Sequence, residues 1–405
     1  MLKAPRNFKP VPFAYHEEIE LEIEDLTNLG DGVGRWQDWV VFVPYALPGE
    51  RVRVRIWRNK SRYSDGDLVE VLRPSPERVE PRCPLFGDCG GCQYQHYSYA
   101  AQLEWKSRQI EQLLAKMAGV EITVQRCVGD EQYPYGYRSK LTPHFSRPPQ
   151  IAQTPIGFQR AMSRSIVDVP CCPIALPAIN VALEQERQRL RAGAVPYRKG
   201  GTLLLRDGLE GVETDMKKVI RTRVGTQTFS FVAGEFFQNN PFMLPRLVEY
   251  TVRACAGEPV RYLIDTYCGV GVFGIYGASL FEAVCGIEIN PQAIALARAN
   301  ASENGVTNIA FSHGKAEAVF TGLNFPPEQS CVLLDPPRKG CDAAFLEQLL
   351  AYCPARIVYV SCGPDTQARD VAILLKAGYE VGSVQPFDLF PQTRHIENVI
   401  SLQRV

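Results

Sequence analysis

Three cysteines lie within ten residues in the stretch "CPLFGDCGGC": Cys83, Cys89 and Cys92. Thiols spaced this closely among turn-forming residues are typical of metal sites, because thiolates bind both zinc and iron. The chain has 13 cysteines and begins without the apolar segment of a secretory signal. We therefore expect a cytoplasmic protein whose thiols stay reduced. The triplet predicts a metal site with a fourth ligand elsewhere; the alternative is a group of unligated thiols.

A second cysteine pattern lies near the C-terminal end, in "VYVSCGPDTQARD". Cys362 follows an apolar strand and precedes Gly-Pro. A free cysteine is often only a small core residue, but a position at the mouth of a strand favours chemistry. The motif "LLDPPRKG" places Asp335 and Arg338 after another apolar strand. Neither motif is typical of hydride transfer.

The segment "DTYCGVGVFG" contains glycines with the spacing G-x-G-x-x-G, at Gly269, Gly271 and Gly274. Such a turn lets the backbone approach a cofactor, and Glu288, at the end of the next predicted strand, could accept bonds from ribose hydroxyls. Nicotinamide enzymes and S-adenosylmethionine enzymes both use this pair. The motifs around Asp335 and Cys362 favour the second class over a dehydrogenase.

A methyl donor combined with a thiol suggests carbon-5 of uracil as the acceptor. This carbon is a poor nucleophile until a thiolate adds to carbon-6, which is covalent catalysis. A base must then remove the carbon-5 proton so that the thiol can leave. Glu397, in "PQTRHIENVISL", is a candidate base; the alternative is a solvent-facing carboxylate.

The elements that must position these groups fall into three regions. Residues 18–72 have short β-branched runs split by Gly-Asp-Gly and Pro-Gly turns, which predicts an all-β region. Within it, alternation puts Val52, Val54 and Ile56 inside and the row Arg51, Arg53 and Arg55 outside. Arg58, Lys60 and Arg62 extend this basic run, with Trp57 and Tyr63 between them. The row is either a solvated strand face or the surface of a small RNA-binding barrel.

After the cysteine triplet, residues 98–119 predict a helix, and a mixed β-rich stretch continues to about residue 225. From residue 235 helices alternate with Val-, Ile- and Leu-rich strands, which predicts a doubly wound parallel sheet. Ligands of such sheets bind beyond the carboxyl ends of the strands. No apolar run reaches the roughly 20 residues of a membrane helix. The formal net charge is zero, so nucleic-acid contacts must come from local patches.

These motifs, in this order, resemble the RNA 5-methyluridine (uracil-C5) methyltransferases, a family that includes bacterial 23S ribosomal RNA enzymes and enzymes for tRNA position 54. The resemblance also covers "YGYRSKLTPHF", "IGFQRAMSRSIVDVPCCPI" and "GEFFQNNPFML". It implies a multidomain α/β protein with a TRAM/OB-like β-barrel at 1–75 and a central β-rich iron-sulfur domain at 76–230. A Rossmann-like class I methyltransferase domain would cover 231–405, and the helix near 98–118 could pack on it.

The resemblance also implies roles for individual residues. Cys362 would be the nucleophile and Glu397 the base. Gln238, Tyr267, Glu288 and Asp335 would contact S-adenosylmethionine. Cys83, Cys89, Cys92 and Cys172 would hold a 4Fe-4S cluster, although spacing alone also fits zinc, and the neighbouring Cys171 could replace Cys172. Two positions depart from the family pattern: Val272 and Gly363 stand where asparagine is usual.

The expected function is methylation of carbon-5 of a uridine in 23S ribosomal RNA during rRNA processing, by a monomeric enzyme that contacts no membrane. The alternative is tRNA position 54. A cytosine-C5 methyltransferase would carry its cysteine where Arg338 stands, and amino-group methyltransferases need no Cys362–Glu397 pair. A catalytically silent RNA-binding iron-sulfur protein is disfavoured because both residues are present.

Overall fold

The computed structural model describes residues 4–146, 154–193, 199–314, 320 and 322–405. The chain forms two compact units. The first contains Met1–Gln102, Phe158–Val169 and Gln392–Arg394, and the second contains Leu103–Gly157, Pro170–Pro391 and His395–Val405. No helix in the described part of the chain is long and apolar enough to cross a membrane.

The first unit begins with a closed five-stranded barrel in the order β1-β2-β3-β5-β4. Val52, Val54 and Ile56 are fully buried, as the alternation predicts. The strands are β1 (Glu18–Leu26), β2 (Asp31–Trp36), β3 (Trp39–Pro44), β4 (Arg51–Asn59) and β5 (Tyr63–Arg73).

Acidic residues of the neighbouring strands neutralise the arginine row on the outside of β4. Because β4 lies between β1 and β5, each arginine can reach a carboxylate across the ladder. The pairs are Arg51–Glu20 at 2.9 Å, Arg53–Glu70 at 3.0 Å, Arg55–Asp67 at 3.2 Å and Arg58–Asp65 at 2.6 Å. This face is therefore a salt-bridged strand surface and not a row of free cations.

The cysteine loop of the first unit packs on a hairpin made by β8 (Gly157–Gln159) and β9 (Ile166–Asp168). The Gly90 amide donates to the Gln159 carbonyl at 3.0 Å, and the Ala161 amide donates to the Asp88 carbonyl at 2.8 Å. Arg160 also forms an ion pair with Asp88. The loop is thus fixed by its partner hairpin.

A seven-stranded sheet dominates the second unit, in the order β17-β16-β15-β18-β19-β21-β20. The first five strands in this order are parallel, as expected, but β21 is antiparallel to both β19 and β20. The expectation of a parallel sheet is therefore wrong for β21 alone, because β20 runs in the same direction as the first five strands. The strands are β15 (Tyr262–Thr266), β16 (Ala283–Glu288), β17 (Ile309–His313), β18 (Ser330–Leu334), β19 (Arg356–Ser361), β20 (Tyr379–Phe387) and β21 (Glu397–Arg404).

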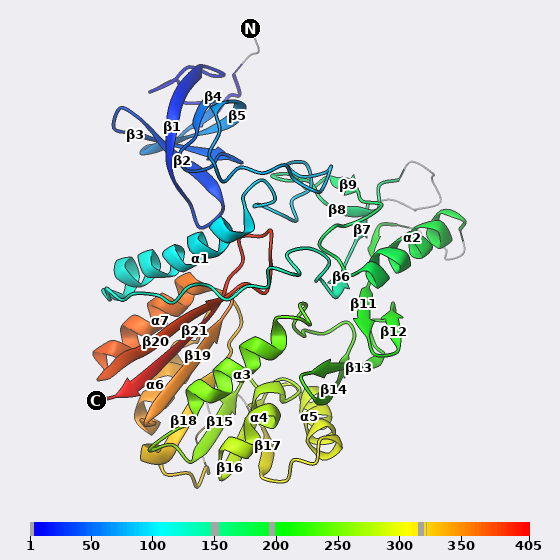
Figure 1. Cartoon of the computed structure of the whole chain (residues 1–405), viewed down its shortest axis with the longest axis vertical. Helices are drawn as coiled ribbons and strands as arrows, with labels where there is room; N and C mark the ends of the chain where they lie inside the picture. The colour runs from blue at the N-terminus through cyan, green and yellow to red at the C-terminus, as the bar shows by residue number, and fades with distance from the viewer. Residues whose placement is uncertain (1–3, 147–153, 194–198, 315–319, 321) are drawn as a thin grey trace. The chain divides into compact units, whose positions relative to one another are not determined.

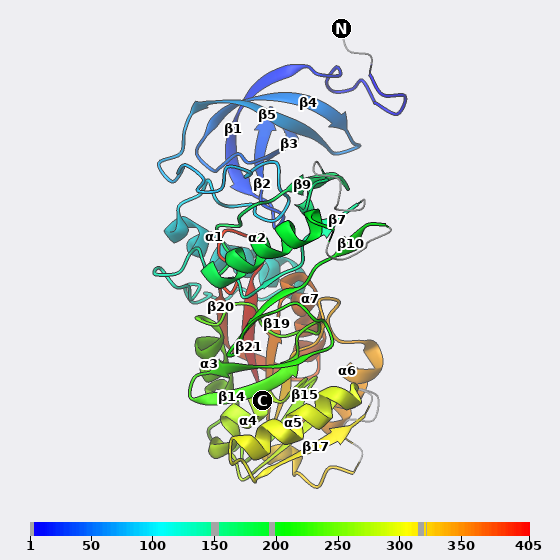
Figure 2. The ribbon, with the colours of Figure 1, turned by 90° about the vertical axis from the view of Figure 1, so that its right-hand side faces the viewer.

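Helices cover both faces of this sheet (Figures 1 and 2). On one face lie α3 (Leu244–Cys255), α4 (Val272–Gly277) and α5 (Pro291–Glu303). On the other lie α6 (Ala343–Tyr352), α7 (Pro364–Lys376) and the end of α1 (Tyr99–Leu113), which continues as a π-helical turn at Leu114–Ala118. Short 3-10 turns occur at Ala278–Leu280 and Pro327–Gln329.

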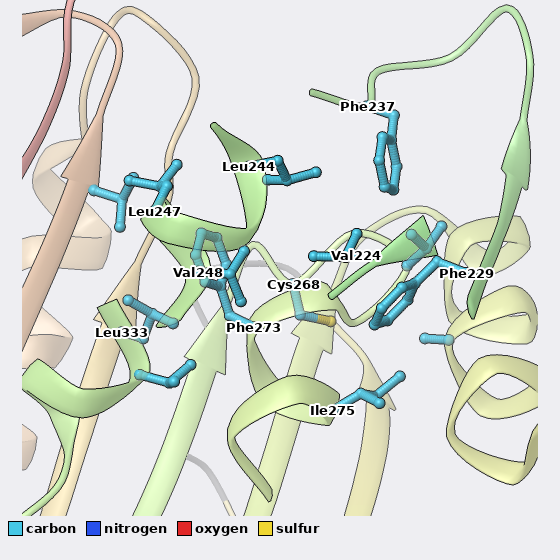
Figure 3. Close-up of a cluster of buried hydrophobic side chains, with 14 of the residues drawn as sticks. Val224, Phe229, Phe237, Leu244, Leu247, Val248, Cys268, Phe273, Ile275 and Leu333 are labelled. Atoms are coloured by element: carbon cyan, nitrogen blue, oxygen red, sulfur yellow. The ribbon is translucent and has the colours of Figure 1, made fainter. Parts of the chain in front are cut away.

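Figure 3 shows part of the apolar cluster that surrounds Cys268. Leu244, Leu247 and Val248 of α3 meet Phe273 of α4 and Leu333 of β18, while Val224 and Phe229 approach from another segment. That segment is the hairpin β13 (Val219–Val224) and β14 (Gln227–Val232). Its Thr228 and Ser230 amides donate to the Asn304 and Asn300 side chains near the end of α5.

Residues of the expected central domain, 76–230, are divided between the two units. The physical reason is visible in β13 and β14, because Ile220 and Val224 of β13 and the two phenylalanines of β14 belong to the core of the seven-stranded sheet. The remaining elements of this region are β6 (Lys140–Leu141), β7 (His144–Phe145), α2 (Pro177–Arg191), β10 (Gly201–Thr202), β11 (Leu205–Gly208) and β12 (Gly211–Glu213).

Candidate active site

Cys362 directly follows β19 and stands before α7. Pro364 opens the helix, where its fixed φ is favourable, and the Gly363 amide donates to Ser361 Oγ at 3.0 Å. A Cβ atom at position 363 would lie 2.7 Å from the carbonyl oxygen of Arg338. The turn therefore needs glycine, and it leaves Cys362 half-buried at the carboxyl edge of the sheet.

Glu397 begins β21 and lies next to Cys362. The antiparallel ladder ends at the pair Ser361–Asn398, and Cys362 and Glu397 are the next residues beyond that pair on the two segments. The Glu397 side chain is buried, and its charge is one of the causes that raise the pKa of Cys362. The strand order thus brings together two groups that are 35 residues apart in the chain.

Arg338 is the cation shared by these two groups. The pKa of the Cys362 thiol is raised to about 11, chiefly by burial and also by the charge of Glu397, while Arg338 opposes both effects by its charge and a hydrogen bond. Burial also raises the pKa of Glu397 well above its usual range, with Asp335 adding and Arg338 opposing. A thiolate or carboxylate formed here is consequently a strong nucleophile or base. The Arg338 guanidinium also lies 3.3 Å from His395 Nδ1.

The glycine loop after β15 lies at the same edge of the sheet. Gly269 and Gly271 have φ of 55° and 86°, which glycine adopts without strain. Glu288, at the end of β16, accepts hydrogen bonds from the Gly269 amide at 3.1 Å and the Asn290 amide at 2.8 Å. These bonds hold the carboxylate at the loop, where ribose hydroxyls of a nucleoside cofactor could bind it.

Two further carboxyl groups lie in this region. Burial raises the pKa of Asp335 to about 7 and that of Asp265 to about 7, with Asp335 and Glu288 among the groups that raise the second value. Asp265 accepts a bond from the Gly274 amide, but its other oxygen has no hydrogen-bond partner in the described residues. An acidic site with an unsatisfied buried oxygen fits a cationic cofactor such as S-adenosylmethionine.

Gln238 comes from a separate segment before α3. Arg206, on β11, is buried and donates to the carbonyls of Phe237 and Gln238 at 3.1 and 3.3 Å. The Phe237 ring stacks on Phe231 with centroids 4.3 Å apart. Glu235 of the same segment lies 3.4 Å from the Asn290 side chain, which follows Glu288 in the chain.

The structure therefore groups Cys362, Glu397 and Asp335 at one edge, with Glu288 and Tyr267 at the neighbouring strand ends. The Tyr267 ring packs 5.4 Å from Phe345 of α6, centroid to centroid. Sequence reasoning did not assign Arg338 or Asp265 to the site. Both lie inside the motifs that drew attention to their neighbours, and only the pairing of strands reveals their contacts.

Of the expected metal ligands, Cys83, Cys89 and Cys92 are partly exposed in the first unit, and Cys83 is one of the causes that raise the pKa of Cys89. Cys171 and Cys172 belong to the second unit, where the Cys172 amide donates to the Asn180 side chain at 2.8 Å. Over the described ranges, no group of three or more His, Cys, Asp or Glu side chains is arranged to hold a metal ion.

The sheet order, the glycine loop and the acidic strand ends define a methyltransferase. A model described as "tRNA (Uracil-5-)-methyltransferase" matches residues 213–405, and a TRAM domain model matches residues 16–69. The tRNA (uracil(54)-C(5))-methyltransferase of Schizosaccharomyces pombe is 38% identical over 421 residues, covering 98% of this chain and 80% of the relative. An uncharacterized RNA methyltransferase of Thermosynechococcus vestitus is 32% identical over 441 residues, covering 95% and 97%.

Among solved structures, the Pyrococcus abyssi tRNA (uracil-54, C5)-methyltransferase in complex with S-adenosyl-L-homocysteine is similar, with a TM-score of 0.73 and 26% identity. The match covers 95% of this chain and all of that one. The chain belongs to the RNA uracil-5-methyltransferase family with a TRAM domain. It is an S-adenosylmethionine-dependent RNA (uracil-C5) methyltransferase, which confirms the expected family, enzyme class and RNA substrate.

Proposed function

We propose that the enzyme methylates carbon-5 of uridine 54 in tRNA. The observation that carries this proposal is the match over 98% of the chain to two yeast enzymes named for that uridine, those of Schizosaccharomyces pombe and Saccharomyces cerevisiae. The Saccharomyces cerevisiae enzyme is 32% identical over 487 residues, and the match covers 75% of its length. The Pyrococcus abyssi structure bears the same name. The comparisons thus favour tRNA over the expected 23S ribosomal RNA.

For the chemistry, we propose that the Cys362 thiolate adds to carbon-6 of the uracil and makes carbon-5 nucleophilic. When bound, S-adenosylmethionine supplies the methyl group that carbon-5 takes up. The Glu397 carboxylate then removes the carbon-5 proton, and the Cys362 thiolate is eliminated. The proximity of the two groups at the end of the β19–β21 ladder, where the charge of Glu397 raises the pKa of Cys362, supports this division of roles.

The cofactor would bind where the strand ends meet. Glu288 would bind the ribose hydroxyls of the cofactor, and Asp335 would bind a cationic group of it. Tyr267 and Gln238 would contact the rest of the cofactor. This assignment is supported by the fixed orientation of Glu288 and by the burial of Asp335, because burial raises its pKa and a bound cation would stabilise the carboxylate form.

RNA that carries 5-fluorouracil tests the mechanism, because fluorine cannot be removed as a proton. The wild-type enzyme should form a denaturation-resistant adduct, Cys362→Ala should form none, and Cys353→Ala, at a partly exposed cysteine after α6, should resemble wild type. Glu397→Gln should stall after addition and trap ordinary RNA. An adduct that survives Cys362→Ala would refute the proposed nucleophile.

The substrate is tested separately by mapping 5-methyluridine in tRNA and in 23S ribosomal RNA from cells lacking the gene. Loss of the modification at tRNA position 54 alone is expected. Loss in ribosomal RNA with tRNA unchanged would overturn the tRNA assignment and restore the first expectation.

We also propose that Cys83, Cys89, Cys92 and Cys172 hold a 4Fe-4S cluster with a structural role. The support is chemical: three partly exposed thiols lie in one loop, and Cys83 is close enough to be one of the causes that raise the pKa of Cys89. Protein purified without oxygen should contain about four irons per chain and absorb near 400 nm. Protein that contains zinc in place of iron, or neither metal, would contradict the proposal. A comparison of the iron content of Cys171→Ser and Cys172→Ser identifies the fourth ligand, because only loss of the true ligand should lower it.

A further inference from the structure

The turn between β8 and β9 presents an apolar side chain to solvent. Met162 is 77% exposed, and its backbone has a φ of 56°. A left-handed conformation is unfavourable for most residues other than glycine and asparagine. Exposure of a large apolar side chain is also unfavourable. Glycine would therefore suit the fold better than methionine at this position.

The turn itself is held on both sides. The Arg160 amide donates to the Ser165 carbonyl at 2.8 Å, and the Ser163 amide donates to the Arg160 carbonyl at 3.1 Å. The Ser163 and Ser165 hydroxyls lie 3.0 Å apart. Because Arg160 and Ala161 are also tied to Asp88 of the cysteine loop, Met162 projects from a fixed backbone. Binding through its side chain would require little further ordering of the chain.

The charge beside the methionine indicates the kind of partner. Arg164 is exposed, and in the part of the chain that the structure describes no carboxylate lies within ion-pair distance of it. The Arg160 guanidinium, by contrast, is already paired with Asp88. One apolar group next to one free cation matches a base next to its phosphate. A stable protein partner would need a wider apolar surface than a single methionine provides.

We propose that Met162 and Arg164 form an RNA contact, in which the Met162 side chain packs against or between bases and Arg164 binds a neighbouring phosphate. Enzymes that act on a base must extract it from its stack, and apolar side chains including methionine serve as wedges that hold such a stack open. The inference rests on RNA as the substrate and is independent of the tRNA assignment.

The experiment uses the full chain and measures binding to tRNA and, separately, to ribosomal RNA from cells lacking the gene. Met162→Gly removes the side chain and also removes the strain of a left-handed backbone conformation at a non-glycine residue. We expect an unchanged or higher melting temperature, unchanged binding of S-adenosylhomocysteine, and RNA binding weakened about fivefold to tenfold. Met162→Leu should stay within about twofold of wild type. Arg164→Gln should lower the salt dependence of binding by about one phosphate contact.

Met117→Gly serves as the matched control, since Met117 is 44% exposed and follows α1. RNA binding by this variant should equal that of wild type. A photo-crosslinking residue at position 162 should attach to RNA. If Met162→Gly binds RNA like wild type, or if position 162 crosslinks only to protein, the inference is overturned. If the enzyme instead prefers ribosomal RNA and Met162→Gly still weakens RNA binding, only the tRNA assignment is overturned.

Discussion

The carbonyl oxygen of Arg338 lies so close to Gly363 that a larger residue at position 363 would contact it too closely. A Cβ at Gly363 would lie 2.7 Å from this oxygen and 2.8 Å from Thr366 Oγ1, while Thr366 Oγ1 donates to the same carbonyl at 2.9 Å. The loop after β18 therefore packs directly on the turn that carries Cys362. The glycine that departs from the family pattern is required by this packing.

Gly363→Asn, which installs the usual family residue, should impair this enzyme. The new Cβ would push the Arg338 loop away from Cys362, so kcat should fall about tenfold or more and stability by about 1–3 kcal/mol. Gly363→Ala should show much of the same effect, because the conflict begins at Cβ. Single-turnover rates and thermal melting test this; a fully active Asn variant would show that the loop yields easily.

Removal of the Arg338 charge should shift the pH dependence of methylation. The guanidinium lowers the pKa of both Cys362 and Glu397. Both groups must lose a proton to act, so the rate should rise with pH, and Arg338→Met should move that rise to higher pH. At neutral pH the variant should be about tenfold slower, and Arg338→Lys should recover part of the rate. An unchanged pH profile of kcat would argue against the electrostatic role.

The ion pair between Lys106 of α1 and Asp388, after β20, is completely buried, with Nζ and Oδ1 2.7 Å apart. Lys106→Met alone should destabilise the second unit by about 3–5 kcal/mol, because it leaves Asp388 charged and without its cation. Lys106→Met combined with Asp388→Leu should recover most of that loss. Thermal denaturation measures both variants; equal stability of the single and double variants would mean that the pair is uncoupled.

RNA binding by the barrel should depend on its free cations and not on the paired row. Lys60 and Arg62 at the β4–β5 turn are exposed, and across the described residues neither has a carboxylate within ion-pair distance. Lys60→Gln with Arg62→Gln should reduce the log–log salt slope of RNA binding by about 1.4–1.8. Arg51→Gln with Glu20→Gln, which removes a neutral pair, should change it little. The opposite ranking would place the RNA on the β4 face.

Much of this arrangement could be predicted because buried strands and glycine turns leave local signals. The inward positions of β4 are predicted by the alternation of apolar and charged residues. Cys362 and Asp335 could be assigned to the site because each comes directly after an apolar strand. The reversed direction of β21 leaves no such signal, since a buried strand has the same composition either way. β17 buries only Phe311 well and was missed. α2 was also missed, although Pro177 and the spacing of Ile179, Leu183 and Leu190 fit a helix.

Cross-strand partners are the second limit. The sequence around Arg51, Arg53 and Arg55 does not say that β1 and β5 supply their carboxylates. In the same way, nothing near Cys362 points to Arg338 or to the ladder with β21. Such contacts depend on strand order, which the sequence of one strand does not contain.

The place of β21 between β19 and β20 has a consequence for protein synthesis. During translation the thiol-bearing turn leaves the ribosome before Glu397, and the gap beside β19 can close only after residues 397–404 have emerged. The step that completes the sheet is then also the step that delivers the proposed base. A nascent chain halted before that point would carry the sulfur without its carboxylate and should remain inert toward RNA.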